Sequence, residues 1–311
     1  MSRIYEALQR AEAERQAGKE ERPVRETPLR TTSAVSLAFQ EEPSLGAGGP
    51  QLVEDLDGPL TLDESFLATV PRQTWNMSVD RFPSLLGRGS AVEQFRSLRS
   101  RVQEFRAANR LKTLLISSGL PQEGKSFVAT NLAVSLALHK NSKVLLVDGD
   151  MRRSTLHHYF GTQATPGLTD YLASRASLAE VMQQGEANST PAELTGRILK
   201  NLTLIPSGDG GDKAADLIGT HKFEELVATA SPLFDWIIVD SSPVIPVSDA
   251  VGLARGCDAV LLVARSGVTT FPVAQRAQEE FKASKVIGFV LNGVKKPPVM
   301  GNYYGYDGTG E

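Results

Sequence analysis

Cysteine is almost absent from this sequence, and no apolar run is long enough to cross a bilayer. The single thiol, Cys257, cannot form an internal disulfide, and one cysteine in 311 residues is typical of a reducing compartment. A transmembrane helix needs about 20 consecutive apolar residues, and no stretch of the sequence supplies them. We therefore expect a cytoplasmic protein; if it works at a membrane, something else must hold it there.

The sequence also lacks a large excess of charge of either sign. The formal net charge is -3 at pH 7, which gives no overall attraction to nucleic acid or anionic lipid. We expect no nucleic-acid partner. The hydrophobic fraction of 41% and the charged fraction of 22% are those of an ordinary soluble globular protein.

The first 89 residues lack the sustained periodicity of a packed domain. Residues 1–19 predict a short amphipathic helix, either a docking element or a solvated helix, because three apolar residues fall at helical spacing: Ile4, Leu8 and Ala11. Residues 20–89 are rich in proline and glycine and show no period of 2 or 3.6 residues. Such a segment cannot bury enough apolar surface to offset the entropy of ordering it, so we predict a linker. Within it, Trp75 and Phe82 are candidates to pack on the following domain.

From residue 90 to 296 helical and extended patterns alternate. The strand cores are apolar without alternation, as in strands buried on both faces, so we predict one doubly wound α/β domain with a mostly parallel sheet and helices on both faces. Expected strands are 112–117, 143–147, 202–206, 236–239, 259–264 and 286–291. Expected helices are 91–109, 124–139, 154–160, 168–174, 178–184, 213–230, 248–255 and 272–283. Residues 297–311 predict an irregular tail.

A phosphate-binding motif lies between the first strand and the helix that follows it. Residues 119–126 read Gly-Leu-Pro-Gln-Glu-Gly-Lys-Ser and match G-x-x-x-x-G-K-[ST], the P-loop. In this motif backbone N–H groups converge on the phosphates at a helix N-terminus, the lysine reaches the β and γ oxygens, and the serine hydroxyl can bind Mg²⁺. The candidate nucleotide-binding residues are Gly119, Leu120, Pro121, Gln122, Glu123, Gly124, Lys125, Ser126 and the adjacent Phe127.

Acidic residues follow two other buried strands. Asp148, Asp150 and Arg152 follow one strand, and Asp240 follows another. Ligands of open α/β sheets bind outside the carboxyl ends of the strands, so these motifs should meet the P-loop at one edge. Mg²⁺ prefers few carboxylates and several waters. We expect ATP and Mg²⁺ as cofactors, with Ser126 and one or two of the aspartates as metal ligands and another aspartate as a base. The sequence does not assign these roles among the three aspartates.

Three of the six tyrosines lie in the expected tail: Tyr303, Tyr304 and Tyr306. The tail leaves the sheet at the same edge as the P-loop, and about eleven residues of extended chain span roughly 36–40 Å. A phenol could therefore reach its own phosphate site or that of a neighbouring subunit. Attack on phosphorus would benefit from a carboxylate base and from nearby positive charge.

Together these motifs resemble the bacterial tyrosine kinases (BY-kinases), which act in capsule and exopolysaccharide synthesis. The resemblance rests on the P-loop ending Glu123–Ser126, the Leu-Val-Asp148-x-Asp150-x-Arg152 strand end, the Ile-Val-Asp240-x-x-Pro243 strand end and the tyrosine tail. It covers about residues 90–306. It implies a tyrosine autokinase in which the aspartates of the Asp-x-Asp motif serve Mg²⁺ binding and tyrosine activation.

The resemblance also implies roles for further residues, and partners, that the spacing of residues alone does not indicate. Glu93, Arg96 and Arg99 match the family's Glu-x-x-Arg-x-x-Arg helix, which builds a ring of subunits for phosphorylation in trans, and Asn292 is a candidate for the base edge. The implied partners are other copies of the chain, a membrane adaptor of the polysaccharide chain-length-regulator type and a tyrosine phosphatase. Two positions depart from the family pattern: Gln122 stands where a glycine is common, and Ser242 stands in the family's Asp-Thr-Pro-Pro.

Two other functions remain open from the residues alone. An ATPase of the cell-division or plasmid-partition type shares this fold, but such proteins have a lysine directly after the first P-loop glycine, where this chain has Leu120. A nucleotide-gated scaffold with weak kinase activity is the third hypothesis. A dinucleotide-binding dehydrogenase is disfavoured because no G-x-G-x-x-G follows the first strand.

Overall fold

The computed structural model describes residues 64–77, 79–85, 88–139, 142–187, 198, 200–210 and 214–294. The predicted helix over 1–19 and the tail over 297–311, with its three tyrosines, lie outside these residues. No helix within the described part of the chain is long and apolar enough to cross a membrane.

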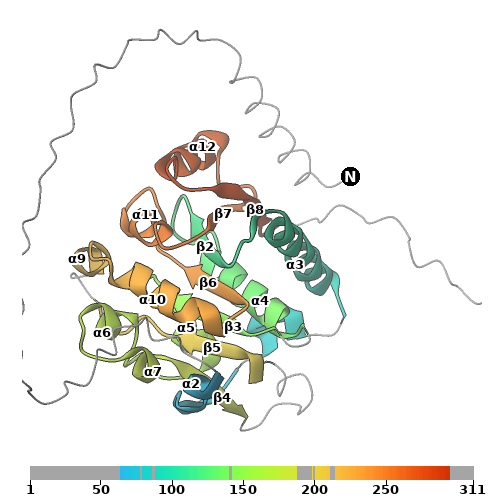
Figure 1. The fold of residues 1–311 in the computed structure, drawn as a ribbon. Helices are drawn as coiled ribbons and strands as arrows, with labels where there is room; N and C mark the ends of the chain where they lie inside the picture. Colours follow the sequence, from blue (N-terminus) through green and yellow to red (C-terminus); the bar gives the residue numbers. More distant parts are fainter. Residues whose placement is uncertain are drawn as a thin grey trace, which may run out of the picture.

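A single eight-stranded sheet forms the centre of the described chain, in the order β1-β4-β5-β3-β6-β2-β7-β8 (Figure 1). Every pairing is parallel except that of β4 with β5. The strands are β1 (Arg72–Trp75), β2 (Thr113–Ser118), β3 (Val144–Asp148), β4 (Gln183–Ala187), β5 (Leu202–Ile205), β6 (Trp236–Asp240), β7 (Ala259–Arg265) and β8 (Val286–Asn292). The mostly parallel sheet confirms the predicted fold class.

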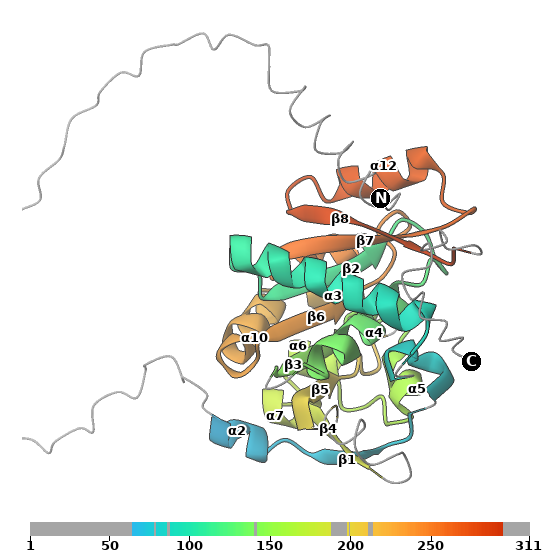
Figure 2. The ribbon, with the colours of Figure 1, turned by 90° about the vertical axis from the view of Figure 1, so that its right-hand side faces the viewer.

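Helices cover both faces of the sheet, and each face has its own core. One core includes residues of α3 (Ser90–Asn109), α4 (Lys125–Ala137) and α5 (Leu156–Phe160), and the other includes residues of the remaining helices (Figure 2). Those are α2 (Glu64–Ala68), α6 (Leu168–Leu172), α7 (Leu178–Val181), α9 (Ala214–Ile218), α10 (Lys222–Ala230), α11 (Asp249–Ala254) and α12 (Phe271–Glu280). Because neighbouring strand residues such as Leu114 and Leu115 point into opposite cores, the strands are apolar throughout.

The linker predicted over 20–89 is wrong for its last part. Residues 64–77 and 79–85 are folded: β1 pairs with β4 at the edge of the sheet, and Trp75 and Phe82 are buried. The Trp75 ring centroid lies 4.7 Å from that of Phe160, and the Phe82 centroid lies 5.5 Å from it. The expected packing of the two aromatic residues is thus confirmed. The strand escaped prediction because it is only four residues long and its partner is more than 100 residues away.

Two predicted helices differ in the structure. The helix expected over 178–184 ends at Val181, and β4 begins two residues later. The helix expected over 213–230 is interrupted between Ile218 and Lys222, where Gly219 and Thr220 form a turn. Glycine carries a high entropic cost inside a helix, so a break at this position is favoured.

The parallel register brings the acidic strand ends to one place. In the pairing of β3 with β6, Asp148 lies opposite Asp240, and in the pairing of β2 with β6, Ile116 lies opposite Asp240. The P-loop follows β2 directly. Three segments far apart in the sequence therefore end side by side at the carboxyl edge of the sheet.

Candidate active site

The P-loop connects β2 to α4, and its backbone is held in special conformations. Gly124 has φ 94°, in the left-handed region, and a Cβ at this position would collide with the Asn292 amide. Gln122 has φ 64°. A glycine is favoured at such a φ because it has no Cβ. Gln122 thus occupies a glycine-type backbone position, which explains physically why glycine suits this place in the loop.

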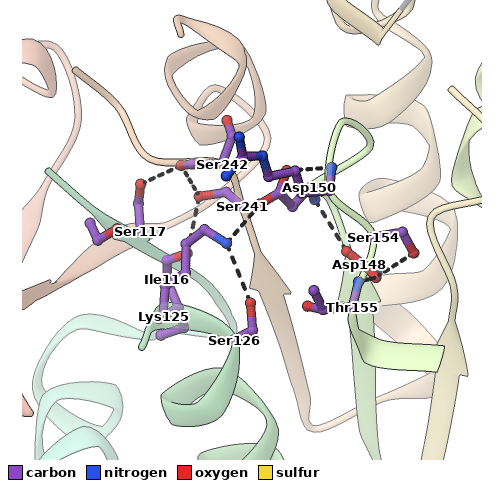
Figure 3. Close-up of polar contacts among 12 residues, drawn as sticks. Ile116, Ser117, Lys125, Ser126, Asp148, Asp150, Ser154, Thr155, Ser241 and Ser242 are labelled. Carbon is purple, nitrogen blue, oxygen red and sulfur yellow. Dashed lines mark hydrogen bonds and ion pairs between the residues drawn. The ribbon is translucent and has the colours of Figure 1, made fainter. Parts of the chain in front are cut away.

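The P-loop lysine is mostly buried and is paired with an aspartate from the next strand end (Figure 3). Lys125 Nζ lies 2.7 Å from Asp150 Oδ2 and 3.3 Å from the hydroxyl of Ser126. Burial alone would lower the pKa of Lys125, but the negative charges of Asp240, Asp150 and Asp148 outweigh burial and raise it. The lysine is therefore a fixed cation at the strand ends where the acidic residues meet.

Asp148 holds the loop that follows β3. Its Oδ2 accepts hydrogen bonds from Ser154 Oγ at 3.1 Å and from the N–H groups of Thr155 and Leu156 at 3.2 and 3.1 Å. These donors fix the start of α5 relative to the strand end. Burial, with the nearby Asp240 charge, raises the pKa of Asp148 to about 7.

Asp240 is buried, and neither of its carboxylate oxygens makes a hydrogen bond of ordinary geometry within the described residues, although the Ser126 hydroxyl and the Ser241 N–H lie near it. Burial raises its pKa to about 6, although the Lys125 charge and the nearby Ser126 hydroxyl oppose the rise. A buried carboxylate without partners is costly unless a cation completes its surroundings. The donor set fits Mg²⁺, which takes one or two carboxylates and a hydroxyl together with phosphate oxygens and waters. The described residues contain no group of three or more His, Cys, Asp or Glu side chains suited to a metal held by protein ligands alone.

The turn after β6 is tied to β2 by two serines. Ser241 Oγ donates to the Ile116 carbonyl at 3.0 Å, and Ser117 Oγ donates to the Ser242 carbonyl at 3.0 Å (Figure 3). The second bond uses the backbone of Ser242. The departure from the family pattern at this position therefore leaves the link between the two strand ends intact.

Arg152 pairs with a carboxylate that lies outside the group of Asp148, Asp150 and Asp240. Its guanidinium pairs with Asp249, with Nε 2.6 Å from Oδ2 and Nη2 3.3 Å from Oδ1. Asp249 is nearly buried in the first turn of α11. The pair joins the loop after β3 to α11. Sequence reasoning missed this partner, and its only signal was an acidic residue at the predicted start of a helix.

Asn292 and Phe127 make different contacts near the P-loop. Asn292, at the end of β8, donates from Nδ2 to the Glu123 carbonyl at 3.0 Å. It therefore lies beside the P-loop, and its contact with the base edge stays a prediction. The side chain of Phe127 packs on Phe95 of α3, with ring centroids 5.7 Å apart.

The three charged residues of α3 do not form one exposed set. Glu93 and Arg96 are exposed and form an ion pair of 2.6 Å. Arg99 instead donates from Nη1 to the Ser135 carbonyl of α4 at 2.9 Å. Its partly buried guanidinium thereby links α3 to α4.

The fold and the site define a P-loop nucleotide-binding protein with an acidic cluster at the carboxyl edge of a parallel sheet. No protein-family model matches the chain. Among proteins of known name, the Bacillus subtilis tyrosine-protein kinase YwqD is 33% identical over 219 residues, which cover 70% of this chain and 86% of that protein. The Salmonella typhimurium tyrosine-protein kinase wzc is 27% identical over 271 residues, covering 81% of this chain but 36% of that protein.

Solved structures agree with these relatives. The kinase domain of the Escherichia coli tyrosine kinase ETK matches with a TM-score of 0.60 and 30% identity, covering 66% of this chain and 76% of that chain. The BceF tyrosine kinase domain matches with a TM-score of 0.57 and 26% identity, covering 75% and 98%. The chain belongs to the bacterial tyrosine-protein kinases. It is thus a protein-tyrosine kinase that uses a P-loop nucleotide site, and the division-type ATPase is not favoured.

Replacing Gln122 by glycine should relieve strain in the P-loop. A non-glycine residue in the left-handed region costs about 1–2 kcal/mol, so we expect Gln122→Gly to raise the free energy of unfolding by up to about 1 kcal/mol. Gln122→Ala keeps the Cβ and should give no such gain. Chemical denaturation of both variants measures this difference. Equal stability of the two variants would show that the backbone at residue 122 is unstrained.

The buried Asp240 should make stability depend on pH in metal-free, nucleotide-free protein. Its folded pKa of about 6 exceeds the ordinary value of 3.8, so the folded state holds the proton longer and stability falls as pH rises through this window. Asp240→Asn removes this penalty, and we expect it to stabilise the protein at pH 8 by on the order of 1–3 kcal/mol, with the difference shrinking toward pH 4. Denaturation in EDTA at both pH values measures it.

Glu104→Gln is the control for that experiment, since it removes one negative charge from an exposed position on α3. It should leave the pH profile of stability close to that of the unsubstituted protein. A destabilised Asp240→Asn variant at pH 8 would contradict the account of Asp240 given above.

Proposed function

We propose that this tyrosine kinase transfers the γ-phosphoryl group of ATP to tyrosines of its own C-terminal tail, in trans between copies of the chain. The observation that carries the proposal is the position of Lys125 among three buried carboxylates at the strand ends next to the P-loop. Phosphoryl transfer depends mainly on positioning and charge neutralisation. This cluster supplies both.

Binding of ATP must rearrange the pair of Lys125 and Asp150. The phosphates compete with Asp150 for the ammonium group, and the lysine side chain is long enough to turn toward the P-loop N–H groups. We propose that Ser126, Asp150 and Asp240 hold Mg²⁺, which neutralises phosphate charge when bound.

A carboxylate of the same cluster takes the proton of the attacking phenol. An efficient base has a pKa near the operating pH, and the pKa values of Asp148 and Asp240 are raised to about 7 and about 6. Arg152 orients the loop that carries Asp150 through its pair with Asp249. The accepting residues on the tail are Tyr303, Tyr304 and Tyr306.

The cellular role follows from the family resemblance. We propose that the kinase regulates capsule or exopolysaccharide synthesis or export, working at the inner face of the plasma membrane through an adaptor of the chain-length-regulator type. A tyrosine phosphatase would reset the tail. The related tyrosine-protein kinases support the kinase activity on which these proposals rest. The adaptor and the phosphatase are proposed from the shared motifs.

Autophosphorylation of the tail is the direct test. Purified protein with Mg·ATP should acquire phosphotyrosine at Tyr303, Tyr304 or Tyr306, mapped by mass spectrometry, and Lys125→Met should abolish it because the phosphates lose their buried cation. The matched control replaces all three tyrosines by phenylalanine, which should remove tail phosphate and leave ATP binding intact. A tail free of phosphate alongside intact ATP hydrolysis would favour an ATPase or scaffold.

The exposed pair of Glu93 and Arg96 is our candidate for the contact between copies. We expect Arg96→Ala to lower the assembled mass measured by light scattering, because a charged group at the subunit contact is lost. Arg101→Ala removes the same charge elsewhere on α3 and should leave the mass unchanged. Arg99 is unsuitable for this test because it also bonds α3 to α4. An Arg96→Ala protein with unchanged mass would rule out this contact.

A further inference from the structure

The P-loop contains an acidic residue, Glu123, in a loop that binds an anion. Its side chain is 1% exposed, so its carboxylate must find partners within the protein. One partner is in the loop itself: the Leu120 N–H donates to Glu123 Oε2 at 2.8 Å. This bond closes a short turn at the start of the P-loop.

The other partner comes from a different part of the fold. The hydroxyl of Thr269, in the connection between β7 and α12, donates to Glu123 Oε1. The same hydroxyl accepts a hydrogen bond from the Arg265 N–H at 2.7 Å. Both hydrogen-bonding capacities of the Thr269 hydroxyl are thus used, and its direction is fixed. An ionised carboxylate accepts bonds only, which matches a donating hydroxyl on one oxygen and a donating N–H on the other.

Two further bonds reach the P-loop from the ends of β7 and β8. Arg265 Nη1 donates to the Gln122 carbonyl at 3.3 Å, and Asn292 Nδ2 donates to the Glu123 carbonyl at 3.0 Å. Because β7 and β8 are paired with Arg265 opposite Asn292, these donors approach the P-loop from one rigid sheet edge. Among them, Thr269 alone holds the acidic side chain.

We propose that Thr269 is a positioning residue for nucleotide binding, which keeps the Glu123 carboxylate turned away from the phosphates. With the hydroxyl in place, Glu123 is held by Thr269 and orients the Leu120 N–H. Without it, a buried negative charge loses a charge-assisted hydrogen bond and is free to turn toward the bound anion. This inference rests on the proposed nucleotide site and adds a residue outside the P-loop motif to it.

The test compares Thr269→Val, which has nearly the same shape without the hydroxyl, with Thr269→Ser, which keeps it. Loss of a hydrogen bond to a charged group corresponds to about a tenfold weakening or more, so we expect the Kd of Mg·ATP to rise about tenfold in Thr269→Val. Thr269→Ser should restore binding to within about twofold of the unsubstituted protein. Titration of the full chain with a fluorescent ATP analogue measures each Kd.

A double-substitution cycle separates positioning from general destabilisation. Glu123→Gln removes the charge that Thr269 controls, so adding Thr269→Val to Glu123→Gln should change the Kd by less than about twofold. A purely structural role would lower the thermal unfolding midpoint and weaken binding equally in both backgrounds. That result, or a Thr269→Val protein that binds within twofold of the unsubstituted chain, would overturn the proposal.

A failure of the Thr269 proposal can be told apart from a failure of the proposed kinase function. The double-substitution cycle measures the Kd of Mg·ATP and does not depend on phosphotyrosine formation. If the unsubstituted protein binds Mg·ATP but places no phosphate on the tail, the autokinase proposal fails while the role of Thr269 is still decided by the cycle.

Discussion

Three buried carboxylates share one edge of the sheet with one mostly buried lysine. The surrounding groups compensate for this excess of negative charge. Lys125 pairs with Asp150, Asp148 is satisfied by a hydroxyl and backbone N–H groups, and Asp240 is left without a hydrogen bond. The first two arrangements offset the cost of removing a charge from water. Asp240, whose charge is least compensated by hydrogen bonds, is the carboxylate best suited to bind a cation.

The parallel register is what makes this concentration of charge possible. Asp148 and Asp240 are opposite each other in the β3–β6 pairing. Burial and the Asp240 charge raise the pKa of Asp148, and burial and the Asp150 charge raise the pKa of Asp240. An antiparallel pairing of the same strands would place their carboxyl ends at opposite edges. The strand register therefore determines that these negative charges lie close together.

The sequence was sufficient to predict those parts that depend on local pattern. The apolar strand runs, the P-loop and the acidic strand ends all follow from short motifs, and the structure has them at the predicted edge. What could not be predicted depends on contacts between distant residues. β1 is recognisable only through its pairing with β4. Arg152 and Asp249 are 97 residues apart in the sequence, and Glu123 and Thr269 are 146 residues apart. A four-residue strand at a sheet edge and a lone threonine carry no periodic signal.

The same distinction explains why the three aspartates could not be sorted from the sequence. All three follow buried strands, and their residue type is identical; only the donors around each one differ. Asp150 is held by Lys125 and Asp148 by the turn before α5, whereas neither oxygen of Asp240 makes a hydrogen bond of ordinary geometry within the described chain. In a buried site a few hydrogen bonds decide the role of a carboxylate. Asp148 has them and holds a loop, whereas Asp240 lacks them and can take a ligand. The chemistry of this edge is therefore set by what surrounds each aspartate, and Asp240 is the one of the three that the described protein groups hold least.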